Sequence, residues 1–190
     1  MTKHPPASEA ERDAVAMRML KFEARTRTIR LATGLSEEYI RRLYHHAAIA
    51  KTTSRHRGRS PSSVAQFTRN HATQLESSII SGVLITHGLL KGRRPKPWLH
   101  IGLQYARLFC AAYAEYLQLA HGEALNFEQA WYFARCLAAR GEIYLQHCAR
   151  CDSHVVRDSS TVLKHPCPVC KLREQQAGTK TTQRPRPHKD

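Results

Sequence analysis

The sequence predicts a mainly α-helical fold, in which a helical N-terminal and central core is followed by a small C-terminal segment built around cysteines. Apolar residues recur at helical spacing through most of residues 1–140. Beyond residue 140 they occur in short runs between polar turns, and four of the six cysteines lie there. A chain of 190 residues with 42% hydrophobic residues is long enough to bury such a core.

The first helical pattern extends from Asp13 to Leu31 and predicts one helix with a single buried stripe. A turn should follow, because Gly34 can adopt the left-handed conformation that ends a helix. Ser36 is a suitable N-cap for a second helix, and the two glutamates after it suit the positive first turn. The sequence therefore predicts a helix, a turn and a second helix near the N-terminus.

Three more helices are predicted in the middle of the chain, after a basic linker. Residues 51–63 contain no apolar residue, which indicates a loop or linker. Helical spacing resumes from Val64 to Leu90 and again from Trp98 to Ala120. The last of the three should begin at Asn126 as its N-cap and stop at Gly141. Together with the N-terminal helices they form the predicted helical domain, residues 1–140.

Residues 141–172 predict small strands, in short apolar runs such as those around Val155 and Leu163. With so few large apolar side chains, this segment cannot offset an ordering cost of about 1.5 kcal/mol per residue and needs a covalent or metal crosslink. The remaining residues, 173–190, are polar and basic, and we expect a disordered tail there.

The four C-terminal cysteines form two CxxC motifs, Cys148 with Cys151 and Cys167 with Cys170, separated by fifteen residues. Each CxxC turn can direct two thiolates at one tetrahedral ion, and a short hairpin between the motifs would complete a four-sulfur site. This spacing predicts one Zn²⁺ ion per chain in a zinc-ribbon-like segment. A closed four-thiolate shell leaves no position for a reactive water, so we expect a structural role for the metal.

Other uses of these cysteines remain open. Structural disulfides are disfavoured, because the sequence begins without a secretory signal and cytosolic thiols are kept reduced. A redox dithiol would need one CxxC and leave the other idle. Any of His147, His154 and His165 could replace a ligand, although four cysteines already suffice.

The charge of the chain predicts an acidic partner. Thirty Lys and Arg stand against fifteen Asp and Glu, which gives a formal net charge of +15 and a pI near 10.0. The excess occurs in every third of the chain and is largest before residue 63, which favours an extended polyanion over a small acidic substrate. No run approaches eighteen apolar residues, so we expect a soluble, cytoplasmic protein without a membrane segment. The sequence shows no catalytic constellation, and we expect no enzymatic activity.

The predicted turn and second helix resemble a helix-turn-helix, in which a helix enters the DNA major groove and arginines contact bases or phosphates. A corner between two packed helices would use the same capping residues, so this alternative stays open. The arginines of this region and of the linker are the candidate nucleic-acid-binding residues: Arg27, Arg30, Arg41, Arg42, Arg55, Arg57 and Arg59.

Several segments resemble the FlhC family, the bacterial flagellar master transcriptional activator. They are Ala24–Arg25, TGLSEEYIRRLY at 33–44, GRSPSSVAQF at 58–67, AYAEY at 112–116, AWYFAR at 130–135, and the motifs CARC and CPVC. The resemblance implies a mainly helical fold and zinc bound by Cys148, Cys151, Cys167 and Cys170. One position differs, because Gln66 precedes Phe67 where the family usually has tryptophan.

The resemblance also implies partners. Members of the family act in a hetero-hexamer of four FlhD and two FlhC subunits, which binds flagellar promoters and recruits RNA polymerase. The chain would then be a DNA-binding subunit of a transcriptional activator. From the residues alone, two other functions stay open: a zinc-ribbon adaptor that binds protein or RNA, and a CxxC dithiol redox enzyme.

Overall fold

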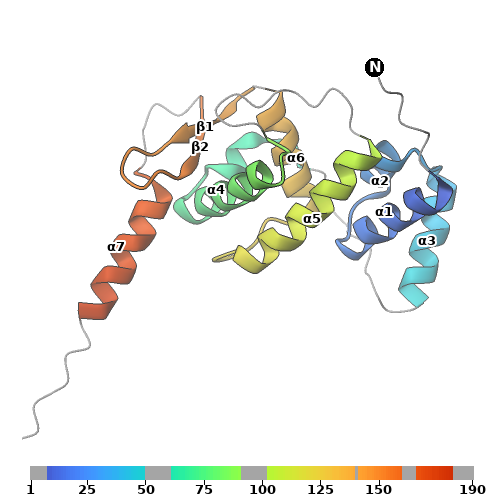
Figure 1. The fold of residues 1–190 in the computed structure, drawn as a ribbon, viewed down its shortest axis with the longest axis horizontal. Coiled ribbons are helices and arrows are strands. Elements are labelled where there is room, and N and C mark those ends of the chain that lie inside the picture. Colours follow the sequence, from blue (N-terminus) through green and yellow to red (C-terminus); the bar gives the residue numbers. More distant parts are fainter. Residues whose placement is uncertain (1–7, 50–60, 91–101, 140, 160–165, 182–190) are drawn as a thin grey trace, which may run out of the picture.

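The computed structural model describes residues 8–49, 61–90, 102–139, 141–159 and 166–181, and in these ranges the chain is mainly helical, as predicted (Figure 1). A small two-stranded sheet and a last helix follow the helical body. The elements are α1 Glu9–Lys21, α2 Thr26–Thr33, α3 Glu37–Ile49, the short 3₁₀ helix η1 Val64–Phe67, α4 His71–Thr86, α5 Leu103–Leu119, α6 Phe127–Ala138, β1 Ile143–His147, β2 His154–Asp158 and α7 Pro168–Thr181.

The single helix predicted from Asp13 to Leu31 is wrong, because the structure has two helices there, α1 and α2. The chain turns between them at Glu23, whose φ of 59° lies in the left-handed region. Phe22, just before this residue, packs against Tyr113 and Phe127 with ring centroids 5.1 and 5.8 Å apart. Burial of this aromatic ring on α5 and α6 therefore accompanies the break.

The predicted turn after α2 is confirmed. Gly34 ends α2 with a φ of 74°, a left-handed conformation that glycine adopts without steric cost. The Ser36 hydroxyl then accepts a hydrogen bond of 3.2 Å from the backbone N–H of Tyr39 and caps α3. Helices α1, α2 and α3 contact one another and form a three-helix unit.

The helix predicted from Val64 to Leu90 is also shorter than expected. It is divided into η1 and α4, because the Asn70 side chain accepts from the N–H of Thr73 at 2.8 Å and starts a new helix. Phe67 is fully buried, whereas Gln66 is half-buried and its amide nitrogen donates to the Ser63 carbonyl at 2.6 Å. The last predicted helix begins after Asn126, as expected, and forms α6.

The core lies between α1, α4, α5 and α6 and is rich in aromatic rings. Phe109 of α5 is central, since its ring lies 4.8 Å from that of Trp131 and 5.3 Å from that of Phe127, both on α6. Both pairs meet edge to face, the arrangement that ring quadrupoles favour. None of the described helices is long and apolar enough to cross a membrane.

A buried carboxylate fixes the connection between α5 and α6 to α4. Glu76 is 2% exposed and accepts hydrogen bonds from the Tyr116 hydroxyl at 2.9 Å and from the backbone N–H groups of His121 and Gly122 at 2.8 and 2.7 Å. The same hydroxyl accepts from the N–H of Leu125 at 2.8 Å. These bonds satisfy a buried charge that would otherwise be costly.

The β-hairpin shares the core of the helical body. Strands β1 and β2 are antiparallel, with Leu145 opposite Val156. Val156 is fully buried, and α4 holds both of its peptide groups: Gln74 donates to its carbonyl at 2.9 Å, and Ser78 accepts from its N–H at 3.3 Å. The hairpin is therefore attached to α4 by hydrogen bonds as well as by apolar packing.

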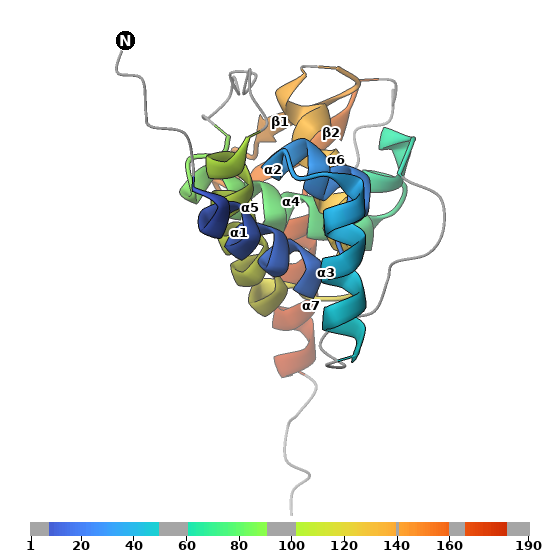
Figure 2. The ribbon, with the colours of Figure 1, turned by 90° about the vertical axis from the view of Figure 1, so that its right-hand side faces the viewer.

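The expected disordered tail from residue 173 is wrong as far as residue 181, because α7 extends over Pro168–Thr181. Proline suits the first position of a helix, and the residues after Cys170 are mostly good helix formers, so local propensity outweighs the polar composition. Helix α7 projects from the body beside the hairpin (Figures 1 and 2). Residues 182–190, and the apolar pair expected around Leu163, lie outside the described residues.

We expect Tyr116→Phe to lower the free energy of unfolding by about 1–3 kcal/mol, because it leaves Glu76 and the Leu125 N–H short of a buried partner. Urea unfolding followed by circular dichroism measures the loss. Tyr144→Phe is the matched control, since Tyr144 is 49% exposed on β1 and should change stability little. Equal stability of the two variants would contradict this role of the Tyr116 hydroxyl.

Candidate metal centre

The two CxxC motifs lie on different elements that meet at one end of the molecule. Cys148 and Cys151 lie in the loop that closes the hairpin between β1 and β2. The loop is shaped by two hydrogen bonds, from the N–H of Cys148 to the Ser153 carbonyl at 3.0 Å and from the N–H of Asp152 to the Cys148 carbonyl at 2.9 Å. Cys167 and Cys170 flank the start of α7. The structure thus brings the four predicted ligands together from two separate elements.

The sulfur positions fit a tetrahedral ion. All four sulfur atoms lie within 4.8 Å of one another. The Sγ atoms of Cys148 and Cys170 are 3.8 Å apart, and those of Cys151 and Cys167 are 3.6 Å apart. A tetrahedron with metal–sulfur bonds of about 2.3 Å has edges of about 3.8 Å, so these spacings match such a shell. They are too long for a disulfide bond of about 2.05 Å, and all six cysteines are free thiols.

Two close sulfur contacts each join one motif to the other, Cys148 with Cys170 and Cys151 with Cys167. A redox dithiol uses the two sulfurs of a single CxxC motif. An ion shared by both motifs instead brings the sulfurs of one motif close to those of the other. The arrangement therefore favours a shared ion over a redox pair.

The pKa values of the four thiols divide them into two pairs. Backbone N–H groups of Arg150 and Cys151 lower the pKa of Cys148. Burial opposes ionisation of Cys151, but hydrogen bonds from Ser153 and neighbouring thiols outweigh it and lower its pKa to about 6. Burial raises the pKa of Cys167 and, with the neighbouring thiols, raises that of Cys170 to about 12. Without an ion the cluster thus favours a mixture of thiolates and thiols, and a dication would favour ionisation of all four.

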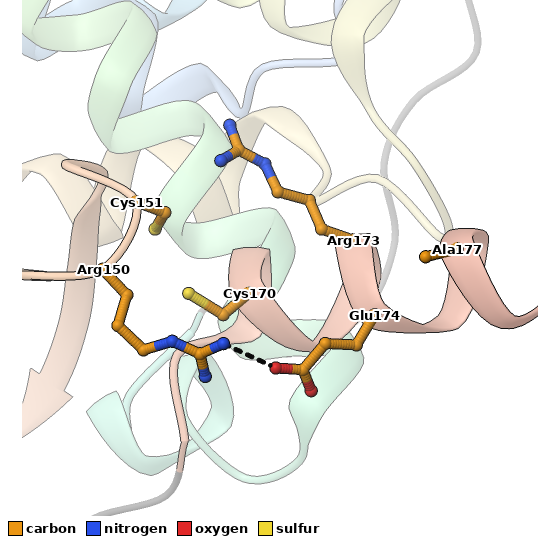
Figure 3. A pocket seen from close by; sticks show the side chains of 6 residues that line it. All are labelled: Arg150, Cys151, Cys170, Arg173, Glu174 and Ala177. Carbon is orange, nitrogen blue, oxygen red and sulfur yellow. Dashed lines mark hydrogen bonds and ion pairs between the residues drawn. The ribbon is translucent and has the colours of Figure 1, made fainter.

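A small pocket of about 260 Å³ opens beside the sulfurs of Cys151 and Cys170 (Figure 3). Arg150 and Glu174 line it and form an ion pair at 2.9 Å, and Arg173 lies on another side. In the sequence, Arg150, Lys164 and Lys171 lie close to the motifs and could balance the negative charge of four thiolates around zinc, and of these three Arg150 lines the pocket. Glu174 was not expected, although its position four residues after Cys170 places it on the same face of α7.

The histidines near the motifs lie apart from the sulfur cluster. His147 bonds Asp152 at 3.1 Å, and its ring lies 5.2 Å from that of His154. Within the described residues, the group of potential metal ligands at this end contains the four cysteines and neither of these histidines. His165 lies outside the described residues.

The candidate arginines of the N-terminal unit are at its surface. Arg27, Arg30, Arg41 and Arg42 are all exposed. Glu37 joins two of them across the turn, because it lies 2.8 Å from Arg30 and 3.5 Å from Arg41. The Arg42 guanidinium lies 5.4 Å above the centre of the Tyr39 ring. The linker candidates Arg55, Arg57 and Arg59 lie outside the described residues.

This combination defines a class of protein: a helical body that ends in a closed four-cysteine centre suited to a structural metal ion. The family model for FlhC, described as the flagellar transcriptional activator, matches residues 1–184. The chain therefore belongs to the FlhC family. Membership indicates a flagellar transcriptional activator, and transcription regulators are not an enzyme class. No individual curated protein shows a significant match to the chain.

The hairpin with Cys148 and Cys151 is packed into the main core, whereas, among the described residues, α7 with Cys167 and Cys170 is not. We therefore expect the two elements to respond differently to removal of a metal ion. We expect a chelator to increase backbone hydrogen exchange in α7 while β1, β2 and α4 keep their protection, because the hairpin shares the main core. Hydrogen exchange with mass spectrometry, with and without chelator, measures this difference. Equal loss of protection in the hairpin and in α7 would contradict it.

Proposed function

We propose that this chain is a DNA-binding, zinc-containing subunit of an activator of flagellar operons. The observation that carries the proposal is the family match over residues 1–184, together with four sulfurs that lie within 4.8 Å of one another.

Zinc is the ion that we assign to Cys148, Cys151, Cys167 and Cys170. Four thiolates in a tetrahedron suit zinc, which has no geometric preference of its own and forms closed structural sites with cysteine. When bound, the ion would supply crosslinking and no reactive water. The surrounding residues help by stabilising negative sulfur, since N–H groups of both motifs hydrogen-bond to Cys148 and Cys167.

The α2–α3 unit is the candidate DNA contact among the described residues. Helix α3 buries Ile40, Tyr44 and Ala47 against the body, which leaves the face with Arg41 and Arg42 exposed. Arg30 is exposed in the last turn of α2, next to the turn at Gly34, and Arg27 is exposed at the start of the same helix. This arrangement supports a helix-turn-helix contact, in which arginines of the second helix reach bases or phosphates.

The distribution of charge along the chain supports a second DNA contact, made by the linker at residues 51–63. The described residues hold 16 Lys and Arg against 14 Asp and Glu, so the rest of the chain holds 14 basic residues and one acidic residue. Arg55, Arg57 and Arg59 belong to this second group and follow α3 in the sequence. We therefore assign phosphate contacts to these three arginines, because counterion release by clustered cations provides affinity for DNA without sequence preference.

The partners follow from the family. We propose assembly with FlhD in a hetero-hexamer of four FlhD and two FlhC subunits, and recruitment of RNA polymerase at the promoter in the cytoplasm. Apolar side chains at the end of α5 offer a surface for protein contact, since Leu117 and Leu119 are 43% and 52% exposed. An adaptor that binds protein or RNA would use the same metal centre, and footprinting on a flagellar promoter with FlhD present separates the two functions.

For the DNA contact, we expect Arg41→Ala and Arg42→Ala each to weaken promoter binding and to reduce the slope of log affinity against log salt by about 1. Fluorescence anisotropy of the complex with FlhD, at several salt concentrations, measures both quantities. Arg69→Ala is the matched control, an exposed arginine outside α2 and α3 that should leave the slope unchanged. An unchanged slope in both α3 variants would exclude them from phosphate contact.

For the metal, we expect Cys148→Ser and Cys167→Ser to lose zinc and to release α7 from the hairpin, because each removes a ligand from a different motif. The purified parent protein should contain one zinc per chain by elemental analysis. Cys136→Ser is the matched control, a half-buried cysteine on α6 that should retain zinc. Folded parent protein without zinc would refute the assignment.

A further inference from the structure

The hairpin half of the cysteine centre is rigidly held, independently of any ion. Ile143, Leu145 and Val156 belong to the main hydrophobic core. A second attachment is made by two hydrogen bonds with α4: Gln74 donates to the Val156 carbonyl, and Ser78 accepts from the Val156 N–H. Cys148 and Cys151 therefore stay in place as long as the helical body is folded.

The α7 half is held at one end. The buried residues of α7 and its cap lie between 167 and 170, in a small cluster formed by Val155 and the cysteines themselves. Residue 171 and residues 173–177 are exposed, and α7 projects away from the body (Figure 2). Beyond Leu172 the described side chains of α7 are exposed and gain little from burial, so the position of the helix depends on contacts made near its first two turns, which include contacts with α4.

One of those contacts crosses the cysteine centre. Arg150 lies inside the first motif, between Cys148 and Cys151, and Glu174 lies one helical turn after Cys170. Their ion pair at 2.9 Å thus joins the loop of one motif to the helix of the other. Figure 3 shows the two side chains meeting near Cys151 and Cys170, together with which they line the pocket.

The pair differs from an ordinary surface ion pair in its surroundings. Arg150 is paired with the Glu174 carboxylate and also lines the pocket together with Cys151 and Cys170, so its cation lies beside the sulfurs as well as beside Glu174. Removing Glu174 takes away the connection to α7, whereas removing Arg150 also takes away a cation beside the sulfurs. The two substitutions are therefore expected to have unequal effects, with Arg150 the larger.

We propose that Arg150 and Glu174 are positioning residues that hold α7 against the hairpin loop and thereby slow the loss of the metal ion. This inference rests on the proposed zinc site. The side chains are 72% and 60% exposed, so solvent limits the strength of the pair, and its effect should appear in the rate of metal release more than in metal content.

The experiment is a double-mutant cycle on zinc release. The full chain, loaded with zinc and purified with FlhD if it needs this partner, is mixed with an excess of a coloured chelator, and the rate of zinc transfer is followed by absorbance. The variants are Glu174→Gln, Arg150→Gln and the double substitution. Arg173→Gln is the control, because it removes a cation from the same pocket and leaves the pair intact.

We expect Glu174→Gln to release zinc about two to five times faster than the parent, the range for an exposed ion pair. In the absence of Arg150, the same substitution should have no further effect. In the Arg173→Gln background, Glu174→Gln should still accelerate zinc release by the same factor. Hydrogen exchange in α7 of the zinc-loaded Glu174→Gln variant should rise in parallel.

Two results would overturn the inference: Glu174→Gln leaves the release rate unchanged, or it accelerates release equally with and without Arg150. In both cases the parent still holds zinc, so the proposed zinc site survives. A folded parent that binds no zinc overturns both proposals together.

Discussion

The placement of α7 against the hairpin depends on the convergence of four thiols within 4.8 Å of one another. No large apolar cluster is formed there by the described residues, since the second hydrophobic cluster contains Val155, Val169 and the four cysteines. Four sulfurs at this distance repel one another once ionised, and the thiols that stay protonated do so because burial disfavours their charge. A dication would remove this conflict, and its binding free energy, on the order of 10–16 kcal/mol for comparable sites, is comparable to the whole stability of a typical domain.

Helix α4 connects this centre to the rest of the molecule. Gln74 and Ser78 bind the backbone of β2 on one side, and Glu76 binds the connection between α5 and α6 on the other. These three residues lie within two turns of the same helix, so the hairpin and the aromatic core share one rigid support. The N-terminal unit joins the same body, because Phe22 packs on Phe127 and the Glu128 carboxylate accepts from the Thr28 hydroxyl at 2.9 Å. The four-cysteine centre at one end and an arginine-bearing α3 at the other thus belong to one packed structure.

Much of this could be predicted from local sequence signals. Gly34, Ser36 and Asn126 mark helix ends through their own backbone and side-chain chemistry, and two CxxC motifs fifteen residues apart indicate a shared site. The break at Glu23 could not, because the left-handed glutamate coincides with the packing of Phe22 on helices that are distant in the sequence. Helix α7 was mistaken for a tail because its polar composition conceals good helix propensity. The hydrogen bonds between α4 and Val156 connect residues that are separated by 78 and 82 positions in the sequence. No local sequence pattern predicts such a contact.

The most direct test of the account is X-ray absorption at the zinc edge of the purified, folded protein. The account predicts a first shell of four sulfur atoms at about 2.3 Å, without a nitrogen or oxygen neighbour. A shell that contains imidazole nitrogen or water oxygen, or a folded protein without zinc, would contradict it.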